Sequence, residues 1–493
     1  MSMLRGTRRA LLGGAVLTPQ VLSDSFARGD GALGGRWIGD AFAISGNEVV
    51  GAPTLLGELL VDPGMELDAI EWADQGTPTT NARDNAQAHG GTYSRHLVSD
   101  AASEGCRQNA GGGVGAWNLA STWLYVAGGS ALLAVDAIST IKQTTAAWEQ
   151  HAAVNRQTVG NFWCYLMSGT TVSDFYADDA SCQQISLPTM FASVPDLSID
   201  NVIVSTRVPT LHQGISAGVV MHLDDAATPQ NFLVAHLREA IPLSGVGTIE
   251  LLQCAAGVYT SLIASSIISV ANKANARLAI YKSGTTYQLW YNGVQIGANQ
   301  TIAGLTQTSH GLFMQYTGPT LDDFAVTSGP ILTLGIIGDS ITDGNGEWPD
   351  LLANHINYGM MKKANHSASG NSIMTGMDAQ IAAAAGDDAD IIIIALGTND
   401  GSDAGLQAEY LENVQEIAAS NAGATIYCMG ILPKTVDTFR DENNTKIAAA
   451  AAAASVTYWN TDGWIVPATD TGDGKHPNAA GTAKILAQVL ALI

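Results

Sequence analysis

Four short stretches in the last third of the chain carry the side chains that the hydrolysis of an ester requires. In chain order they are Gly338-Asp339-Ser340, Ser369-Gly370-Asn371, Gly397-Thr398-Asn399-Asp400 and Asp473-Gly474-Lys475-His476. A serine hydroxyl is a poor nucleophile at neutral pH and needs an adjacent base. His476 can accept the Ser340 proton through one ring nitrogen, while Asp473 holds the proton on the other nitrogen. We therefore predict that Ser340, Asp473 and His476 are the catalytic residues.

The order of these stretches carries more information than any one of them. Gly-Asp-Ser alone is ordinary loop sequence, and Asp-Gly-Lys-His alone is typical of a solvated turn. Together they place serine, glycine, asparagine and histidine in that order, with an aspartate three residues before the histidine. This pattern resembles the SGNH hydrolases, the GDSL-like esterases and acylhydrolases, and it covers the last third of the chain. The resemblance implies an acyl-enzyme mechanism that requires neither a cofactor nor a metal.

The resemblance also implies an oxyanion hole, the set of donors that stabilises the negative oxygen of the tetrahedral intermediate. Its members would be the backbone N–H of Ser340, the backbone N–H of Gly370 and the side-chain amide of Asn399. Glycine suits the second position because a bare backbone can approach the substrate closely. Gly376 is the other glycine nearby, but the sequence around Gly370 matches the family pattern better.

Other polar residues in this region are predicted to be structural. We expect Asp339 and Asp400 to support their loops, and His366 to be a hydrogen-bonding loop residue and not a base. Adjacent aspartates could supply oxygen atoms to calcium, but solvated turns explain them better, so we predict no metal site. These pairs are Asp178-Asp179, Asp224-Asp225, Asp322-Asp323 and Asp387-Asp388.

Alternating strands and helices must position the four stretches. The sequence predicts strands at 331–338, 361–366, 391–396, 424–430 and 456–460, and helices at 347–357, 378–385, 405–421, 439–454 and 478–493. Near-continuous apolar strands between helices imply a parallel sheet covered on both faces. We predict an α/β three-layer, flavodoxin-like SGNH hydrolase domain at 331–493. Ser340 then follows the first strand, at the edge where such sheets bind their ligands.

The middle of the chain reads as a β-sandwich. Apolar strand patterns recur from Val194 to Thr327, and Asn292-Gly293 between two of them is a strong signal for a type I′ hairpin. These strands resemble a concanavalin-like (laminin-G-like) jelly roll. That family begins with a pattern that is found here far upstream, at 24–47. We therefore predict one discontinuous sandwich built from 22–54 and 188–330, since insertions are tolerated at loop tips whose ends lie close together.

The inserted segment, 55–187, is predicted to be a second sandwich. Its opening and its Phe175-Tyr176-x-Asp178-Asp179 ending resemble carbohydrate-binding jelly-roll modules. The segment is rich in tryptophan and tyrosine, and by default we expect most of these rings to lie in the core. Sugar binding is the alternative, because a sugar site needs flat rings exposed on one face. The sequence does not single out carbohydrate-binding residues.

The composition restricts the class of partner. The 493 residues carry a net charge of −23, and only 14% of them are charged, whereas a nucleic-acid-binding protein presents a basic face. No run approaches the ~18 apolar residues that a membrane span needs. The five cysteines form no CxxC pair, which argues against a zinc site. We expect separate buried thiols, with one disulfide among Cys106, Cys164 and Cys182 as the alternative.

The first 21 residues combine a basic start with a short apolar run. This combination mimics a secretion or twin-arginine signal, but the run is interrupted by Gly13-Gly14 and lacks a convincing cleavage site. We prefer a docking segment at the start of an assembly protein, and keep a cleaved leader as the alternative.

These features together predict a serine esterase of the SGNH type that removes O-acetyl groups from a polysaccharide. The sandwiches would hold the glycan, and no nucleic-acid partner is expected. The combination of modules also resembles phage tail fibre and tailspike-type proteins, so one alternative is an adhesion protein that binds a receptor glycan. A lipase or thioesterase that acts on small acyl esters is another. We expect an extracellular or virion-associated protein, with a secreted enzyme as the alternative, and a homotrimer or other virion assembly stays open.

Overall fold

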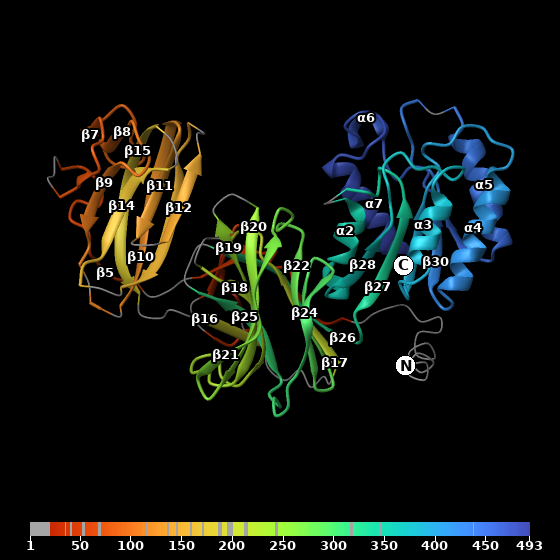
Figure 1. Cartoon of the computed structure of the whole chain (residues 1–493), viewed down its shortest axis with the longest axis horizontal. Coiled ribbons are helices and arrows are strands. Elements are labelled where there is room, and N and C mark those ends of the chain that lie inside the picture. Colours follow the sequence, from red (N-terminus) through yellow and green to blue (C-terminus); the bar gives the residue numbers. More distant parts are fainter. Residues whose placement is uncertain are drawn as a thin grey trace.

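The computed structural model describes residues 20–493 except for short gaps at 35, 40–41, 52–54, 68–70, 112, 115, 136–137, 144–145, 158–159, 170–171, 186–189, 195–200, 212–214, 242–244, 316–318, 345–346 and 437. Residues 1–19 lie outside the described part, so the leader or docking segment stays a prediction. Two bodies made of strands precede a third in which helices flank a sheet (Figure 1). Among the described residues, no helix is long and apolar enough to cross a membrane.

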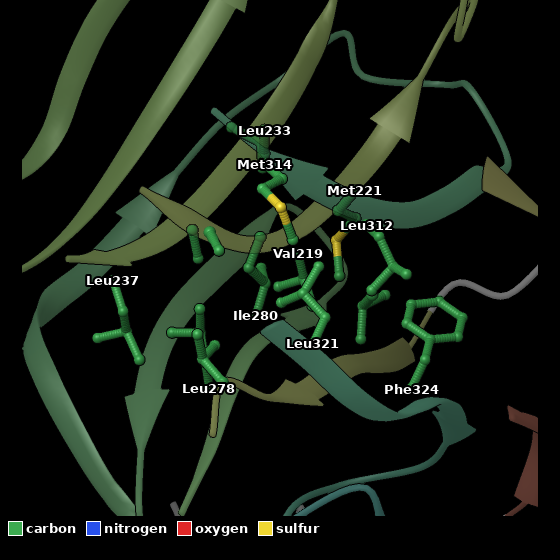
Figure 2. Packing of buried hydrophobic residues seen from close by; sticks show 14 of the residues in the cluster. Val219, Met221, Leu233, Leu237, Leu278, Ile280, Leu312, Met314, Leu321 and Phe324 are labelled. Atoms are coloured by element: carbon green, nitrogen blue, oxygen red, sulfur yellow. The ribbon is translucent and has the colours of Figure 1, made fainter. Parts of the chain in front are cut away.

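The middle body is a sandwich of two antiparallel sheets. The larger sheet contains β1 (Gln20–Asp24), β2 (Gly31–Ala32), β3 (Phe42–Ser45), β4 (Glu48–Gly51), β17 (Asn201–Arg207), β22 (Arg277–Ser283), β23 (Thr286–Tyr291), β24 (Val294–Thr301) and β26 (Thr320–Ser328). The smaller contains β16 (Met190–Val194), β18 (Ala217–Leu223), β19 (Phe232–Ile241), β20 (Val246–Ala255), β21 (Val258–Ser269) and β25 (Ser309–Met314). Leucine, isoleucine, valine and methionine side chains from both sheets fill the space between them (Figure 2).

Strand pairing joins the start of the chain to residues far downstream. β1 and β4 both pair antiparallel with β26, and Ile38 forms a bridge with Ser193. This pairing supports our proposal that 22–54 and 188–330 form one discontinuous sandwich. The predicted hairpin is present: Asn292 and Gly293 join β23 to β24, and their φ angles of 49° and 76° are the positive values that a type I′ turn requires.

The first body is also a pair of antiparallel sheets. One contains β5 (Leu55–Glu58), β7 (Thr80–Asp84), β8 (Ser94–Ser99), β10 (Trp117–Gly128), β13 (Glu149–Arg156) and β15 (Ser173–Ile185). The other contains β6 (Ala73–Gln75), β9 (Gly105–Asn109), β11 (Ser130–Val135), β12 (Ile138–Gln143) and β14 (Trp163–Ser168). The mostly-β architecture of the N-terminal two thirds is thus as expected, while the jelly-roll topology stays a prediction.

The expectation that most aromatic rings of 55–187 lie in the core is wrong. Successive side chains of a strand point to opposite faces of the sheet. On β10 Leu124 and Val126 point into the core, so Trp123 and Tyr125 lie on the other face and are only half-buried. Tyr176, Trp163 and Tyr165 are half-buried in the same way on β15 and β14. Trp72, by contrast, is fully buried.

The C-terminal body is a parallel sheet with helices on both faces, as predicted. Its strands, in spatial order, are β28 (Met361–Asn365), β27 (Leu332–Gly338), β29 (Ile391–Ala395), β30 (Thr425–Met429) and β31 (Thr457–Trp459). This 2-1-3-4-5 order is the flavodoxin-like one. The helices are α2 (Trp348–Ala353), η1 (Ile356–Tyr358), α3 (Met377–Ala384), α4 (Leu406–Ser420), α5 (Arg440–Ala453), α6 (Pro467–Asp470) and α7 (Ala479–Leu492).

Each face of this sheet is covered by its own group of helices. Ile337, Ile392 and Ile394 pack against α3, α4 and α5, whereas Leu334 and Ile336 pack against α2 and α7. The strands are apolar on both faces because both are buried. The alanine run 448–454 lies largely in α5, where small side chains let this helix approach its neighbours closely.

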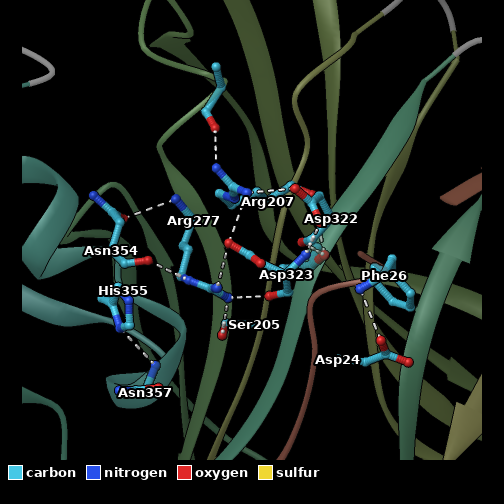
Figure 3. A network of polar contacts seen from close by, with 12 residues as sticks. Asp24, Phe26, Ser205, Arg207, Arg277, Asp322, Asp323, Asn354, His355 and Asn357 are labelled. Carbon is cyan, nitrogen blue, oxygen red and sulfur yellow. Dashed lines mark hydrogen bonds and ion pairs between the residues drawn. The ribbon is translucent and has the colours of Figure 1, made fainter. Parts of the chain in front are cut away.

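The middle sandwich docks directly on the C-terminal body at the end of α2. Arg277 of β22 is fully buried, and its backbone N–H and Nε donate to the side chain and backbone oxygens of Asn354 at 3.0 and 2.6 Å (Figure 3). Asn354 also donates to Asn292 Oδ1 at 2.8 Å. Met360 adds an apolar contact, because it clusters with residues of β17, β22 and β23. The two bodies therefore share a buried, hydrogen-bonded boundary.

Two minor expectations about side chains can be compared with the structure. All five cysteines are free and buried, as preferred. The aspartate pairs are only partly as expected, because Asp178-Asp179 and Asp322-Asp323 lie inside β15 and β26 and not in turns. Each pair sits where the register shifts by one residue, which marks a β-bulge.

Candidate active site

Ser340 directly follows β27, at the carboxyl edge of the parallel sheet. The Asp339 carboxylate accepts a hydrogen bond from the Ile341 N–H at 3.0 Å, and the Asp339 carbonyl accepts one from the Thr342 N–H at 3.0 Å. These bonds turn the chain sharply after the strand and leave Ser340 half-buried. Its Oγ lies 2.9 Å from His476 Nε2. The structure thus brings together two predicted residues that are 136 positions apart in the sequence.

Asp473 holds the other side of the His476 ring. Its Oδ2 lies 2.6 Å from His476 Nδ1, and its Oδ1 accepts the backbone N–H groups of His476 and Lys475 at 2.7 and 2.9 Å. These bonds, led by the one from the His476 N–H, hold the pKa of Asp473 well below its usual range. An ionised carboxylate only accepts, so the Nδ1 atom carries the proton. Nε2 is then the acceptor that faces Ser340.

The loop that delivers this pair is anchored at both ends. Gly474 has a φ of +84°, its N–H donates to Thr471 Oγ1 at 2.9 Å, and its carbonyl accepts from the Thr435 N–H at 2.9 Å. A Cβ at this position would lie 2.6 Å from Thr435 Oγ1, which explains why glycine is present. Asn478 closes the loop by capping α7 through a hydrogen bond from the Gly481 N–H.

Asn399 lies in the loop after β29, at the same edge of the sheet. Its Nδ2 donates to the Asn371 carbonyl at 2.8 Å, and its Oδ1 accepts from Lys475 Nζ at 2.7 Å. The side-chain amide therefore connects the loop that contains Gly370 with the loop that contains His476.

Gly370 lies in the exposed loop after β28. The Ala368 N–H donates to the Gly338 carbonyl at 3.2 Å and the Ser369 N–H donates to Asp343 Oδ2 at 2.8 Å, so the loop is fastened beside the end of β27. Gly370 itself has a φ of +85°, a value that favours glycine. Gly376, the other candidate, is the N-cap residue of α3.

Asp339, Asp400 and His366 make structural contacts. Asp400 accepts the backbone N–H groups of Ile373 and Met374 at 2.8 and 3.1 Å. Burial raises the pKa of Asp339, and its hydrogen bonds with Ile341 and Thr398 oppose that shift. His366 Nε2 lies 2.5 Å from Asp387 Oδ2.

Sequence reasoning missed two ionisable residues at this edge. Lys475 contacts Asn399, although between Asp473 and His476 it reads as an ordinary solvated lysine. Glu347 is the N-cap residue of α2; burial raises the pKa of its carboxyl, and the charge of His476 lowers it. The sequence signal that could have identified them is their position: Lys475 lies inside the Asp473–His476 stretch, and Glu347 follows the Gly338–Ser340 stretch by a few residues. Over the described residues, no group of three or more His, Cys, Asp or Glu side chains is arranged to hold a metal ion.

The comparisons with known proteins concern the C-terminal body. Residues 336–484 match the GDSL-like Lipase/Acylhydrolase family, so this part of the chain is a GDSL-like domain. The comparison with curated proteins gave no match.

Several solved structures are similar to the same part of the chain. An acetylxylan esterase from Geobacillus stearothermophilus is 18% identical over 33% of this chain and 94% of its own, with a TM-score of 0.28. A lipase/acylhydrolase from Enterococcus faecalis is 17% identical over 33% and 95%, with a TM-score of 0.29. The protein TesA is 26% identical over 32% and 96%, with a TM-score of 0.27.

Proposed function

We propose that this protein is a serine esterase that removes O-acetyl groups from a polysaccharide through an acyl-enzyme. The observation that carries the esterase chemistry is the hydrogen-bonded chain Ser340–His476–Asp473, with 2.9 and 2.6 Å between successive partners. Such a chain converts a weak hydroxyl nucleophile into a reactive one. The match of 336–484 to the GDSL-like family supports the same reaction class.

In the proposed acylation step, Ser340 Oγ attacks the ester carbonyl carbon while its proton passes to His476 Nε2. The carbonyl oxygen becomes an oxyanion, which the N–H groups of Ser340 and Gly370 and the Asn399 amide stabilise. Collapse of the intermediate breaks the bond to the alcohol oxygen of the sugar, and that oxygen takes the proton from His476. The acetyl group is then bound to Ser340.

In the proposed deacylation step, His476 removes a proton from water as the water attacks the acetyl-enzyme. The second tetrahedral intermediate releases acetate, and Ser340 Oγ recovers its proton from His476. Asp473 stabilises the imidazolium in both steps without becoming protonated. A carboxylate whose pKa is held low suits this role.

Two observations support a large, polar substrate. The side chains of His476 and Asp473 are 43% and 56% exposed, so the reacting groups are open to a polymer. The first sandwich also presents a group of rings on the outer face of the sheet formed by β7, β8, β10, β13 and β15. Flat, half-exposed rings favour sugar binding, because C–H groups of a pyranose stack on them.

The rings of this outer face are in mutual contact. His89 stacks on Trp123 with 3.8 Å between centroids, and His96 stacks on Tyr176 with 4.3 Å between centroids. Tyr125 lies 6.1 Å from Tyr176 and 5.8 Å from Trp148, between ring centroids. Trp148 in turn lies 5.7 Å from His89, so Tyr125 and Trp148 together link the two stacks. We call these six residues the aromatic face.

Acidic side chains border the aromatic face. Asp174 and Asp179 bind His96 and His89 at 2.9 Å and remain 50% and 42% exposed. Their free oxygens can accept hydrogen bonds from sugar hydroxyls. We propose that the aromatic face holds a neutral glycan, since the carboxylates would repel an anionic one.

The first experiment is acetate release from a panel of acetylated capsule, O-antigen and xylan. We expect release by the parent protein and none by Ser340→Ala. Hydrolysis of short p-nitrophenyl esters alone, lost in Ser340→Ala, would keep the chemistry and reject the polysaccharide. No Ser340-dependent hydrolysis of any ester would reject the esterase and favour adhesion as the main role.

The same panel tests glycan binding by affinity electrophoresis. Trp123→Ala should lose retardation by the glycan, whereas Trp163→Ala, on the outer face of the opposite sheet, should keep it. Equal retardation of the parent and Trp123→Ala would reject the aromatic face as the binding site.

A lipase or thioesterase is the second candidate, because one exposed apolar side chain lies next to a residue that contacts the catalytic loop. Val436 is 85% exposed and follows Thr435, whose N–H binds the loop at Gly474. A series of p-nitrophenyl esters of increasing chain length separates the candidates. A maximum of kcat/KM at acetate supports the deacetylase, and a maximum at long chains supports the second candidate.

A further inference from the structure

Lys475 lies between two residues of the proposed catalytic triad and contacts a third residue of the site. Its side chain extends from the Asp473–His476 loop to Asn399, where Nζ lies 2.7 Å from Oδ1. Its backbone N–H donates to Asp473 Oδ1 at 2.9 Å. One residue thus bonds both to the carboxylate that holds His476 and to the amide assigned to the oxyanion.

The contacts of Asn399 with Lys475 and with the Asn371 carbonyl determine which way its side-chain amide faces. The oxygen and nitrogen of an asparagine amide have nearly the same shape, so a rotation of 180° exchanges them at almost no steric cost. A lysine ammonium only donates hydrogen bonds, so the atom facing it must be Oδ1. On the other side, the Asn371 carbonyl only accepts, so the atom facing it must be Nδ2. Both partners select the same orientation.

This orientation leaves one Nδ2 hydrogen for the substrate. Nδ2 carries two hydrogens, and the Asn371 carbonyl occupies one at 2.8 Å. The other is the hydrogen that the proposed oxyanion hole assigns to an oxyanion formed at Ser340. In the reversed orientation Oδ1 would face that position, and a carbonyl oxygen would repel the negative charge.

We propose that Lys475 is a positioning residue of the oxyanion hole, which holds the Asn399 amide with its nitrogen toward the reacting carbonyl. The ammonium also polarises the amide and makes its N–H groups stronger donors. The inference rests on the serine esterase chemistry proposed above, and it does not depend on whether the substrate is a polysaccharide.

The position of Lys475 in the chain links two parts of the mechanism. The loop that carries His476 to Ser340 also carries the cation that orients Asn399. A displacement of this loop would therefore remove the base together with one of the two contacts that orient the Asn399 amide. Formation of the Ser340–His476 hydrogen bond and formation of the Lys475–Asn399 contact therefore depend on the same loop position.

A simpler role would be a general electrostatic one. The charge of Lys475 also acts on Asp339, whose pKa it lowers against the larger effect of burial. A general field would act whether or not Asn399 is present, whereas a positioning role requires Asn399. A double-mutant cycle separates the two roles.

The experiment measures kcat and KM on p-nitrophenyl acetate for the parent, Lys475→Met, Asn399→Ala and the double variant. Loss of an oxyanion donor typically lowers kcat by about 10²–10³-fold. Because the Lys475 contact is exposed, we expect Lys475→Met to lower kcat by about tenfold with KM nearly unchanged. In the Asn399→Ala background the same change should alter kcat by less than about twofold. Lys475→Arg keeps a cation that only donates, so it should recover most of the loss.

Lys362→Met is the matched control. Lys362 is exposed on β28, near the end of the strand that lies away from the site. Its substitution therefore removes one positive charge from the same body without touching the site. Its kcat should equal that of the parent. Thermal unfolding of every variant excludes loss of fold as the cause.

The outcomes separate the two proposals. A Lys475→Met effect of equal size with and without Asn399, or kcat within twofold of the parent, overturns the positioning role while Ser340-dependent hydrolysis stands. A parent without hydrolysis, and without Ser340 modification by a fluorophosphonate in intact-mass measurements, overturns the esterase and this inference with it.

Discussion

Replacing Asp473 by asparagine tests the proposed triad most directly, because the two side chains have the same shape. The asparagine Oδ1 can still accept the N–H groups of Lys475 and His476, so the loop should keep its conformation. The amide nitrogen would face His476 Nδ1, which lies 2.6 Å from the carboxylate in the parent. An amide N–H cannot accept the Nδ1 proton. The ring would therefore carry its proton on Nε2, against Ser340, where it cannot act as a base.

The size of the effect follows from the exposure of the pair. In a fully buried triad this substitution lowers kcat by about 10⁴-fold. Here the Asp473 and His476 side chains are 56% and 43% exposed, so water competes for the ring nitrogens. We therefore expect a decrease of about 10²–10³-fold. This decrease should appear in the rate of the acylation step.

The assay is the pre-steady-state release of p-nitrophenol from p-nitrophenyl acetate, which isolates acylation of Ser340. Asp441→Asn is the control, because its side chain is 92% exposed on α5 and the same charge is lost. Its acylation rate should equal that of the parent. A rate for Asp473→Asn within fivefold of the parent, with unchanged thermal unfolding, would refute the argument that Asp473 sets the tautomer of His476.

The remaining predictions concern the oxyanion loop, the boundary between bodies and pH. Gly370→Ala places a side chain at a φ of +85° with no atom within 4 Å of the new Cβ, so strain and not collision should tilt the N–H and lower kcat by about tenfold. Gly463→Ala, with a φ of +77° and equal space, should leave kcat unchanged, and equal kcat in both variants would contradict the role of Gly370. Arg277→Met removes a fully buried cation that bonds to Asn354, and we expect a loss of about 3–5 kcal/mol in denaturant unfolding; a loss below about 1 kcal/mol would show that the network adds little. Burial lowers the pKa of His236 to about 4, below its unfolded value of about 6.5. Its contribution to stability is therefore present above pH 6.5 and is lost as the pH falls, by about 2 kcal/mol between pH 7 and pH 5. The free energy of unfolding, measured with urea at each pH, should therefore depend less on pH in His236→Gln than in the parent over that interval. An unchanged dependence on pH would contradict the assignment.

The sequence predicted the strands of the C-terminal body to within about one residue, whereas the helix expected at 347–357 ends at Ala353 and α6 was not expected. The agreement for the strands has a clear physical reason. The run Ile391–Ala395 contains four consecutive isoleucines, follows Asp390 and ends just before Leu396-Gly397, so it identifies a strand buried on both faces without reference to the rest of the chain. The order of the motifs then implied that Ser340 and His476 meet, because the carboxyl ends of parallel strands share one edge.

The parts that the sequence did not predict depend on contacts between distant residues. The presence of aromatic residues does not indicate which face of β10 packs against the core. Leu124 and Val126 occupy the core-facing positions, so the prediction that Trp123 and Tyr125 are buried was wrong. Lys475 reads as a solvated lysine until the fold brings Asn399 within 2.7 Å of it. The register of β1 and β4 on β26 likewise joins residues about 300 positions apart, a distance over which local pattern carries no information.

The first sandwich begins and ends at neighbouring points, and this has an evolutionary consequence. Leu55 of β5 pairs with Ile185 of β15, so the chain enters and leaves the module side by side. The strands that flank it, β4 and β16, pair with β26 and β25 of the middle sandwich and not with the module. A recombination event that replaced this segment would thus leave the host sheets intact. Under the proposed function, such a replacement would change the glycan that the protein binds and would leave the proposed esterase domain unchanged.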